Sequence, residues 1–216
     1  EAGALGMLAL GFATDLARIK KLIDEVKDLT DKPFGANLMI AMNPHNEAIL
    51  ELLAEAGIKL VTTSAGSPKK IYSKIKELGM KALHVTLAAP LAVKAAEAGA
   101  AGVVVSGLES GGLRTNGPEL TNMVLVPLVC DMVDVPVVAA GGIADRRGYR
   151  AALALGAQGV QIGTAFLASE ESPASRAWKE AIIACGDAST TLLPMGGMAM
   201  RTIINPKMAQ LLASGA

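Results

Sequence analysis

The 216-residue sequence predicts an α/β fold, a parallel (β/α)8 barrel one strand short of closure, and three observations lead there. One helix-to-strand joint recurs, in which a glycine ends a helical pattern and a short apolar run follows, as in residues 55–62 and 97–104. Runs such as 135–140 are almost continuously apolar, which is typical of parallel strands buried on both faces. Segments with helical apolar spacing, such as 14–29, lie between these runs.

The elements follow in order along the chain. Strands are predicted near residues 6–10, 34–40, 59–65, 81–87, 102–107, 135–141 and 159–166. Helices are predicted near 14–29, 45–56, 68–78, 89–98, 119–132, 145–155 and 173–184. Seven strands leave a barrel incomplete, and the chain opens on a helix end, Glu1-Ala-Gly. We therefore expect one domain over residues 1–216 whose first strand is missing; an open, doubly wound sheet is the alternative.

Composition excludes several functional classes. Twenty Lys plus Arg balance twenty Asp plus Glu, and six aromatic residues are few, which argues against a nucleic-acid binder. The sequence contains no run of about 20 apolar residues, so it predicts no membrane-spanning helix. Two cysteines, Cys130 and Cys185, indicate neither a zinc site nor a disulfide scaffold. We expect a cytoplasmic protein with a small-molecule substrate, no nucleic acid, no membrane partner and no metal; a homodimer is compatible with this sequence.

Two neighbouring strand ends suit a phosphate. The strand near 135–141 runs into Gly141 and Gly142, and Asp145 is placed to cap the next helix. One unit later, Gly163 and Thr164 offer backbone N–H groups and a hydroxyl. Phosphate sites of (β/α)8 barrels often use the loops after strands seven and eight, so the pair predicts phosphate binding, although each glycine alone fits a tight turn.

Other strand ends are polar or rich in glycine. Residues 106–118 form a long glycine-rich segment that suits either a ligand-covering loop or a solvated surface loop. Residues 62–66 offer hydroxyls, and Asn37 is an amide in an apolar strand. His84 lies inside a predicted strand, which favours a hydrogen-bonded core histidine, whereas His45 precedes a helix. No catalytic triad or metal-ligand spacing is present, and Met195, Met198 and Met200 are interpreted as packing residues.

Over nearly its whole length the chain resembles the nitronate monooxygenase family, also called 2-nitropropane dioxygenase-like, which includes FMN-dependent enoyl-acyl-carrier-protein reductases. The resemblance lies in residues 33–38, 61–66, 107–112, 125–129, 137–145 and 153–164 and in the spaced Gly197, Arg201 and Asn205. It implies an FMN-binding TIM barrel, with an opening strand and a Gly-Gly-Met-type turn before residue 1.

The resemblance also implies site residues. The expected cofactor-binding set is Asn37, Ser106, Gly111, Gly141, Gly142, Gln161, Ile162, Gly163 and Thr164. The expected substrate contacts are Thr62, Thr63, Ser64, Ser110 and Leu113. Two positions depart from the family pattern. Leu113 stands where relatives carry a histidine that acts as base or hydrogen-bond donor, and Ser106 stands where they often carry Gln or Glu.

The implied activity is FMN-dependent oxidation of a nitronate with molecular oxygen. Because leucine cannot transfer a proton, no catalytic residue is assigned, and the candidates are His45, His84 and Arg114. Arg114 suits orienting an anionic substrate. The alternative enzyme is an NAD(P)H-dependent enoyl-acyl-carrier-protein or quinone reductase, with NAD(P)H as co-substrate. Alternatives of other classes are a flavin- or phosphate-binding barrel without turnover and a phosphosugar isomerase or synthase.

Overall fold

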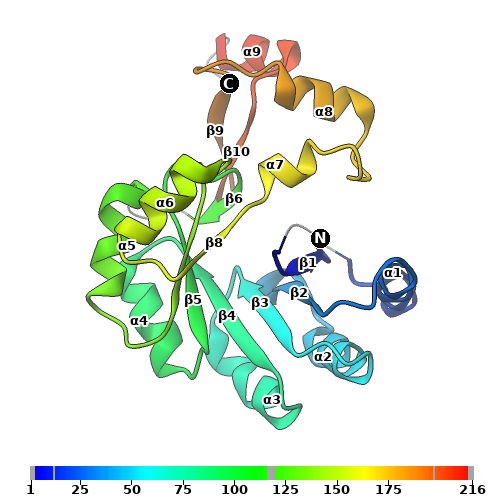
Figure 1. The fold of residues 1–216 in the computed structure, drawn as a ribbon. Coiled ribbons are helices and arrows are strands. Elements are labelled where there is room, and N and C mark those ends of the chain that lie inside the picture. The colour runs from blue at the N-terminus through cyan, green and yellow to red at the C-terminus, as the bar shows by residue number, and fades with distance from the viewer. Residues whose placement is uncertain (1–2, 12, 116–119, 197, 214–216) are drawn as a thin grey trace.

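A computed structural model describes residues 3–11, 13–115, 120–196 and 198–213 (Figure 1). Its main body is a parallel sheet in the order β1-β2-β3-β4-β5-β7-β8. The strands are β1 (Gly6–Ala9), β2 (Phe34–Met39), β3 (Leu60–Ser64), β4 (Lys81–Thr86), β5 (Gly102–Ser106), β7 (Val137–Ala140) and β8 (Gly159–Gln161). All seven predicted strands are therefore confirmed, although β8 ends at Gln161 rather than near residue 166.

The seven predicted helices are also present. They are α1 (Leu16–Leu29), α2 (Asn46–Glu55), α3 (Tyr72–Glu77), α4 (Ala89–Glu97), α5 (Asn122–Cys130), α6 (Arg146–Ala154) and α8 (Arg176–Ile183). Two short 3-10 turns, Ile40–Met42 and Pro68–Lys70, precede α2 and α3. None of the helices in the described ranges is long and apolar enough to cross a membrane.

The recurring joint has the geometry that the sequence indicates. Gly57 and Gly99 follow α2 and α4 with φ of +82° and +97°, a conformation that glycine adopts without a Cβ clash. Beside the first joint, Ile58 donates its backbone N–H to Leu53 O, which satisfies a carbonyl at the helix end. Each joint turns the chain directly into the next strand, so the helices collect on one face of the sheet.

The sheet curls in one direction as an incomplete (β/α)8 barrel. The strands of the large sheet lie in the same order as in the chain, with no reversal, and β6 belongs to a second sheet. A doubly wound sheet would reverse its strand order, so this order contradicts the doubly wound alternative. In the part of the chain that the structure describes, β1 pairs only with β2, and β8 pairs only with β7. The buried core lies between the outer face of the sheet and the helices, and its largest fully buried side chains include Ile23, Leu38, Leu53 and Val103.

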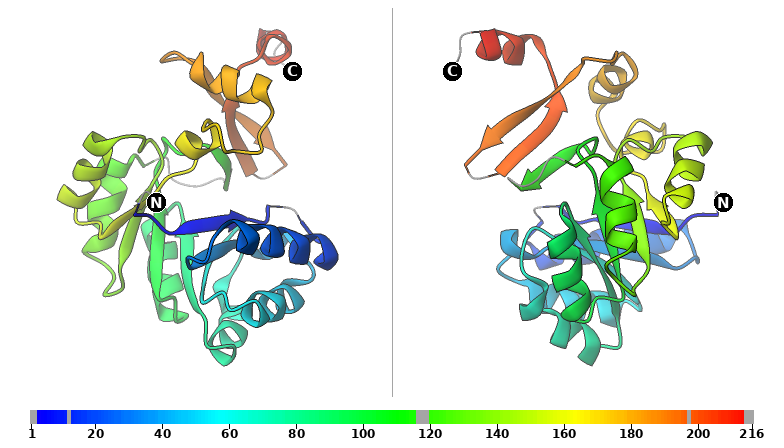
Figure 2. Two further views of the ribbon diagram at one scale, coloured as in Figure 1. Left: turned by 45° about the vertical axis from the view of Figure 1, so that its right-hand side comes forward. Right: turned by 90° about the vertical axis from the view of Figure 1, so that its left-hand side faces the viewer.

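A second, three-stranded antiparallel sheet corrects the sequence analysis. It consists of β6 (Gly112–Thr115), β10 (Met198–Ile203) and β9 (Thr190–Met195) in that order. The glycine-rich segment 106–118 is thus not one loop, since it contains β6; residues 116–119 lie outside the described residues. Two further helices, α7 (Thr164–Leu167) and α9 (Pro206–Ala213), were not predicted. Figure 2 shows the small sheet standing beyond the end of the large sheet where β5 leads into β6.

Candidate active site

Polar side chains from β2 and β3 meet at the carboxyl edge of the large sheet. Asn37 lies opposite Thr62 in the strand register. Its Nδ2 donates to Thr62 Oγ1 at 3.0 Å, so the amide is fixed in orientation. The next strand places the apolar Leu83 beside Thr62. Successive strand residues point to opposite faces, so Asn37 and Thr62 both point to the inner face, away from the helices.

Thr63 and His84 lie on the opposite face of the sheet. Thr63 Oγ1 is 3.0 Å from the Tyr72 hydroxyl of α3 and 2.9 Å from His84 Nδ1. Both Thr63 and His84 are buried, and burial lowers the pKa of His84 to about 4 while it raises the pKa of Tyr72. The structure therefore does not bring Thr63 and His84 to the inner face of the sheet, where Asn37 and Thr62 lie. His84 is the hydrogen-bonded core histidine that its strand position favours.

The loop after β5 is fastened to the end of β7 by Asn122, the first residue of α5. Asn122 Nδ2 donates to Ala140 O at 3.0 Å and to Gly141 O at 2.8 Å. Its Oδ1 accepts from the Gly107 backbone N–H at 3.0 Å. The backbone N–H of Asn122 donates to both carboxylate oxygens of Glu109, at 3.0 and 3.2 Å. One side chain thus holds two strand ends in a fixed relation.

Sequence reasoning missed both Asn122 and Glu109. The signal for Asn122 was available, because it is a polar residue that opens the otherwise apolar helix 122–130. Glu109 stands inside the quoted motif 107–112.

We expect Asn122→Ala to lower the free energy of unfolding by about 2 kcal/mol, because the Gly107 N–H and two carbonyl oxygens lose their partner. Urea titration of both proteins measures this loss. Asn205→Ala is the control, since among the described residues Asn205 Oδ1 accepts one hydrogen bond, from the Met208 N–H at the start of α9. An unchanged urea midpoint for Asn122→Ala would contradict a fastening role.

Arg114 secures the same loop from β6. It is buried, and its NH1 donates to Gly107 O at 2.6 Å and to Ser110 Oγ at 2.5 Å. The structure therefore gives this guanidinium a loop-holding role beside the anion-orienting role expected from the sequence. Leu113 precedes it on the opposite face of β6, with Met200 and then Leu193 across the small sheet. These three half-buried side chains form a continuous apolar row.

The glycine turn after β7 is packed closely under this loop. Gly141 has φ of +95°, and a Cβ there would lie 2.8 Å from Ser110 Cβ. Gly142 has φ of +68°, and a Cβ there would lie 3.1 Å from Glu109 Cβ. Packing and backbone conformation therefore already require both glycines. Ser106 is buried at the end of β5 and lies opposite Ala140 in the strand register.

The start of α6 is already capped by an anion. Asp145 accepts from the backbone N–H groups of Arg147 and Gly148 at 2.8 and 3.3 Å, as the sequence predicts for an N-cap. Its pKa is lowered by the hydrogen bond from the Arg147 side chain and by these backbone bonds. The Asp145 carboxylate thus already accepts from two of the backbone N–H groups at the start of this helix.

The end of β8 remains open. Gln161, Gly163 and Thr164 are exposed and Ile162 is half-buried. A Cβ on Gly163 would meet no atom within 4 Å, and a Cβ on Gly111 would lie 3.8 Å from Thr164 Oγ1. The exposed backbone of residues 163–164 beside a glycine therefore fits a phosphate group.

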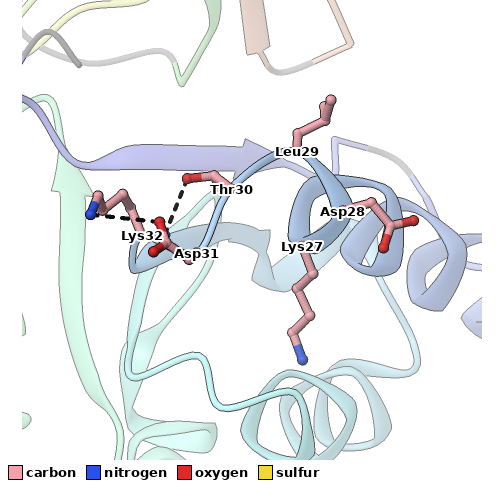
Figure 3. Close-up of a pocket in the computed structure, with 6 residues that line it drawn as sticks. All are labelled: Lys27, Asp28, Leu29, Thr30, Asp31 and Lys32. Atoms are coloured by element: carbon pink, nitrogen blue, oxygen red, sulfur yellow. Dashed lines mark hydrogen bonds and ion pairs between the residues drawn. The ribbon is translucent and has the colours of Figure 1, made fainter.

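Two further predicted site residues, Ser64 and His45, are not fully buried. Ser64 is half-buried at the end of β3. His45 is exposed, and its side chain makes no capping hydrogen bond at the start of α2. Within the described ranges no group of three or more His, Cys, Asp or Glu could hold a metal ion. Figure 3 shows a hollow at the end of α1, lined by residues 27–32, but these side chains come from one surface segment that leads into the amino end of β2.

The curled parallel sheet with its alternating helices places the chain among the (β/α)8-barrel proteins. A model of the nitronate monooxygenase family matches residues 44–214, and the chain belongs to this family. A 5-hydroxy-7a-methyl-1-oxo-octahydro-indene-4-carboxyl-CoA dehydrogenase of Rhodococcus jostii is 39% identical, over 89% of this chain and 53% of the relative. A probable nitronate monooxygenase of Staphylococcus saprophyticus is 32% identical, over 84% of this chain and 63% of the relative.

Two solved structures share the fold. FabK from Thermotoga maritima has a TM-score of 0.89 and 38% identity, covering 98% of this chain and 67% of that chain. Nitroalkane oxidase from Streptomyces ansochromogenes has a TM-score of 0.84 and 27% identity, covering 97% and 72%. The chain thus spans little more than half of the first curated relative and under two thirds of the second.

Proposed function

We propose that this chain forms the FMN-binding part of an oxidoreductase of the nitronate monooxygenase type, which oxidises a nitronate with molecular oxygen. The observation that carries the proposal is the open end of β8 at Gly163 and Thr164, at the same sheet edge as the Asn37–Thr62 pair. When bound, FMN would supply the electron transfer. The FMN-dependent chemistry implied by the resemblance agrees with membership of the family.

The chain's own residues would bind the FMN and orient the flavin and the substrate. Backbone N–H groups of residues 163–164 would donate to the phosphate. Asn37, held by Thr62, would present its amide to the flavin ring at a fixed angle. The apolar row of Leu113, Met200 and Leu193 would exclude water from the substrate. Leu113 cannot hold a proton, so a nitronate, whose carbon is already deprotonated, suits this site better than a neutral nitroalkane.

A second candidate is oxidoreduction of an acyl thioester. Two observations favour it: a carboxyl-CoA dehydrogenase is more similar to this chain than the nitronate monooxygenase described above, and Leu113 replaces the family's histidine with an apolar group. An apolar row suits a hydrocarbon skeleton. NAD(P)H is the proposed electron donor if the reaction is a reduction.

The absorbance spectrum of the purified protein tests both candidates. A flavoprotein is yellow, and bleaching without oxygen identifies the reductant. Bleaching by a nitronate supports the first candidate, whereas bleaching by NAD(P)H or by a saturated acyl thioester supports the second. A yellow protein that none of these bleaches would favour a binding barrel without turnover, and a colourless protein that gains no flavin would contradict the proposal.

We expect Gly163→Val to weaken FMN binding roughly tenfold or more while the fold is kept. The valine side chain meets no protein atom within 4 Å at its Cβ, and φ is not positive, so the change blocks the ligand without straining the chain. Flavin fluorescence titration and circular dichroism measure the two effects. Gly186→Val is the matched control, because a Cβ there meets only Ser189 Oγ at 3.9 Å. Equal FMN affinity in folded Gly163→Val would remove this residue from the site.

A further inference from the structure

Helix α5 is apolar on every side, although one side of it faces solvent. It has no charged residue, and apart from Asn122 its side chains are apolar. Leu125, Val126 and Val129 are fully buried against the sheet. A surface helix normally turns a polar face to water, and a helix that is apolar all round is normally buried. The outer side of α5 therefore has the composition of a covered surface.

This exposed apolar surface extends from α5 to its neighbour α4, which packs beside it (Figure 1). The start of α4, α5 itself and the turn after it contribute five side chains that are each 41–66% exposed. They are named the α5 face here: Leu91, Met123, Val124, Leu128 and Met132. The next helix, α6, shows the usual surface pattern instead, since it exposes Arg146 and Arg150. Single exposed apolar side chains are normal, but a contiguous patch marks an interaction site.

The incomplete barrel does not account for the α5 face. In the described part of the chain, the free edges of the large sheet are β1 and β8. α5 packs on β5 and β7, whereas α6 packs on β8. The ends of α5 and α6 are in contact, since a Cβ on Gly156 would lie 3.2 Å from Cys130 Sγ. A segment that paired with β8 or β1 would therefore lie beyond α6, away from the α5 face.

The two ends of the α5 face are bordered by opposite charges. Arg146 begins α6 at the carboxyl edge of the sheet, because α6 directly follows β7. Asp131 and Asp134 follow α5 at the amino edge, just before β7. All three side chains are exposed, and none of them forms an ion pair with another described residue.

We propose that the α5 face is the interface between two copies of this chain, related by a two-fold axis that packs α5 antiparallel against its copy. A second copy supplies an identical apolar face, as a two-fold interface requires. The antiparallel arrangement places Asp131 and Asp134 of one protomer near Arg146 of the other, at both ends of the interface. A parallel arrangement would bring the two Asp131 side chains together instead.

The size of the α5 face agrees with a dimer. A stable interface buries ~800 Å² on each partner, and homodimer interfaces are about 65% apolar, so each copy must contribute about 500 Å² of apolar surface. The five side chains of the α5 face expose apolar surface on the order of 500 Å². Two of the five are methionines, which are enriched at interfaces and adapt their shape on contact.

Analytical ultracentrifugation of the purified chain tests the interface. We expect the wild type to have the mass of two chains at about 10 µM. Val124→Glu should raise the dimer dissociation constant roughly 100-fold or more, because it buries two carboxylates in apolar surface. Leu29→Glu is the matched control, since Leu29 is an exposed apolar residue on α1, and it should leave the mass unchanged. Circular dichroism establishes that each variant is folded.

A charge exchange tests the antiparallel arrangement. Arg146→Glu and Asp131→Arg each place like charges at both ends of the interface, and each should weaken the dimer roughly tenfold. An equal mixture of the two variants restores an opposite-charge contact at both ends, so it should form a dimer at a concentration at which each variant alone is monomeric. Both changes suit the helix dipole, since they put an acid at the start of α6 and a base at the end of α5.

A wild-type chain that stays monomeric at about 100 µM overturns the inference, because a stable interface of this size would associate well below that concentration. A dimer that Val124→Glu leaves intact also overturns it, since the contact would then use another face. A mixture of the two charge variants that associates no better than either variant alone overturns the antiparallel arrangement.

Discussion

Replacing Leu113 with histidine is expected to raise kcat at least tenfold on a nitronate or on an enoyl thioester. A positioned base or hydrogen-bond donor typically contributes roughly 10²- to 10⁴-fold to a rate, and leucine supplies neither. The resemblance implies that relatives carry a histidine here. Leu113 is half-buried on β6 with Met200 opposite, so an imidazole of similar size fits the same row.

The gain should appear in kcat rather than KM, because proton transfer or hydrogen bonding in the transition state is what the imidazole adds. Steady-state kinetics at equal flavin loading measure it. Leu193→His is the matched control, since Leu193 lies in the same apolar row two strands from β6 and should give no gain. If Leu113→His gains nothing on either substrate, this chain does not use the proton chemistry that the family resemblance implies.

Rapid turnover of neutral nitroalkanes by the wild-type protein would contradict the view that this site lacks a base, since removal of their proton needs one. His84 is a poor candidate for such a base, because it is buried on the helix side of the sheet. His45 is exposed after β2 and would be the first residue to replace.

The large sheet could be predicted from the sequence because its signals are local. A glycine such as Gly57 ends a helix within a few residues of the apolar run that follows, so each helix–strand unit can be recognised from a short stretch of sequence. The small sheet has no local signal. Its strand β6 is four residues long and begins with Gly112, and its partner Arg201 is far away in the sequence. Pairing over such a separation depends on the tertiary fold.

The candidate site was likewise predicted from the sequence only in part. The sequence pointed to the strand ends near Asn37 and Gly163, because polar residues and glycines interrupt apolar strands there. It did not separate Thr62 from Thr63, although consecutive strand residues must point to opposite faces. Asn122 was missed because its contacts reach Ala140 and Gly107, which come from two different strand ends.

Acid should destabilise the protein through His84. Burial lowers the pKa of the folded-state histidine from 6.5 to about 4. Above pH 6.5 the imidazole is neutral in both states, and this group gives no pH dependence. Between pH 6.5 and 4 the unfolded chain takes up a proton that the folded chain does not, so stability falls as the pH falls. The loss approaches about 3 kcal/mol near pH 4 and then levels off, because one pKa unit corresponds to about 1.36 kcal/mol.

Urea titrations of flavin-free protein between pH 7.5 and 4.5 measure this effect. His84→Gln removes the titrating group but keeps a polar side chain beside Thr63, so its unfolding free energy should fall less steeply with pH than that of the wild type. His45→Gln is the matched control, because it makes the same substitution at an exposed histidine. Carboxylates titrate in the same range in all three proteins, so the difference between slopes isolates the histidine. Parallel pH profiles for wild type and His84→Gln would mean that His84 accepts a proton in the folded state, and that burial does not lower its pKa.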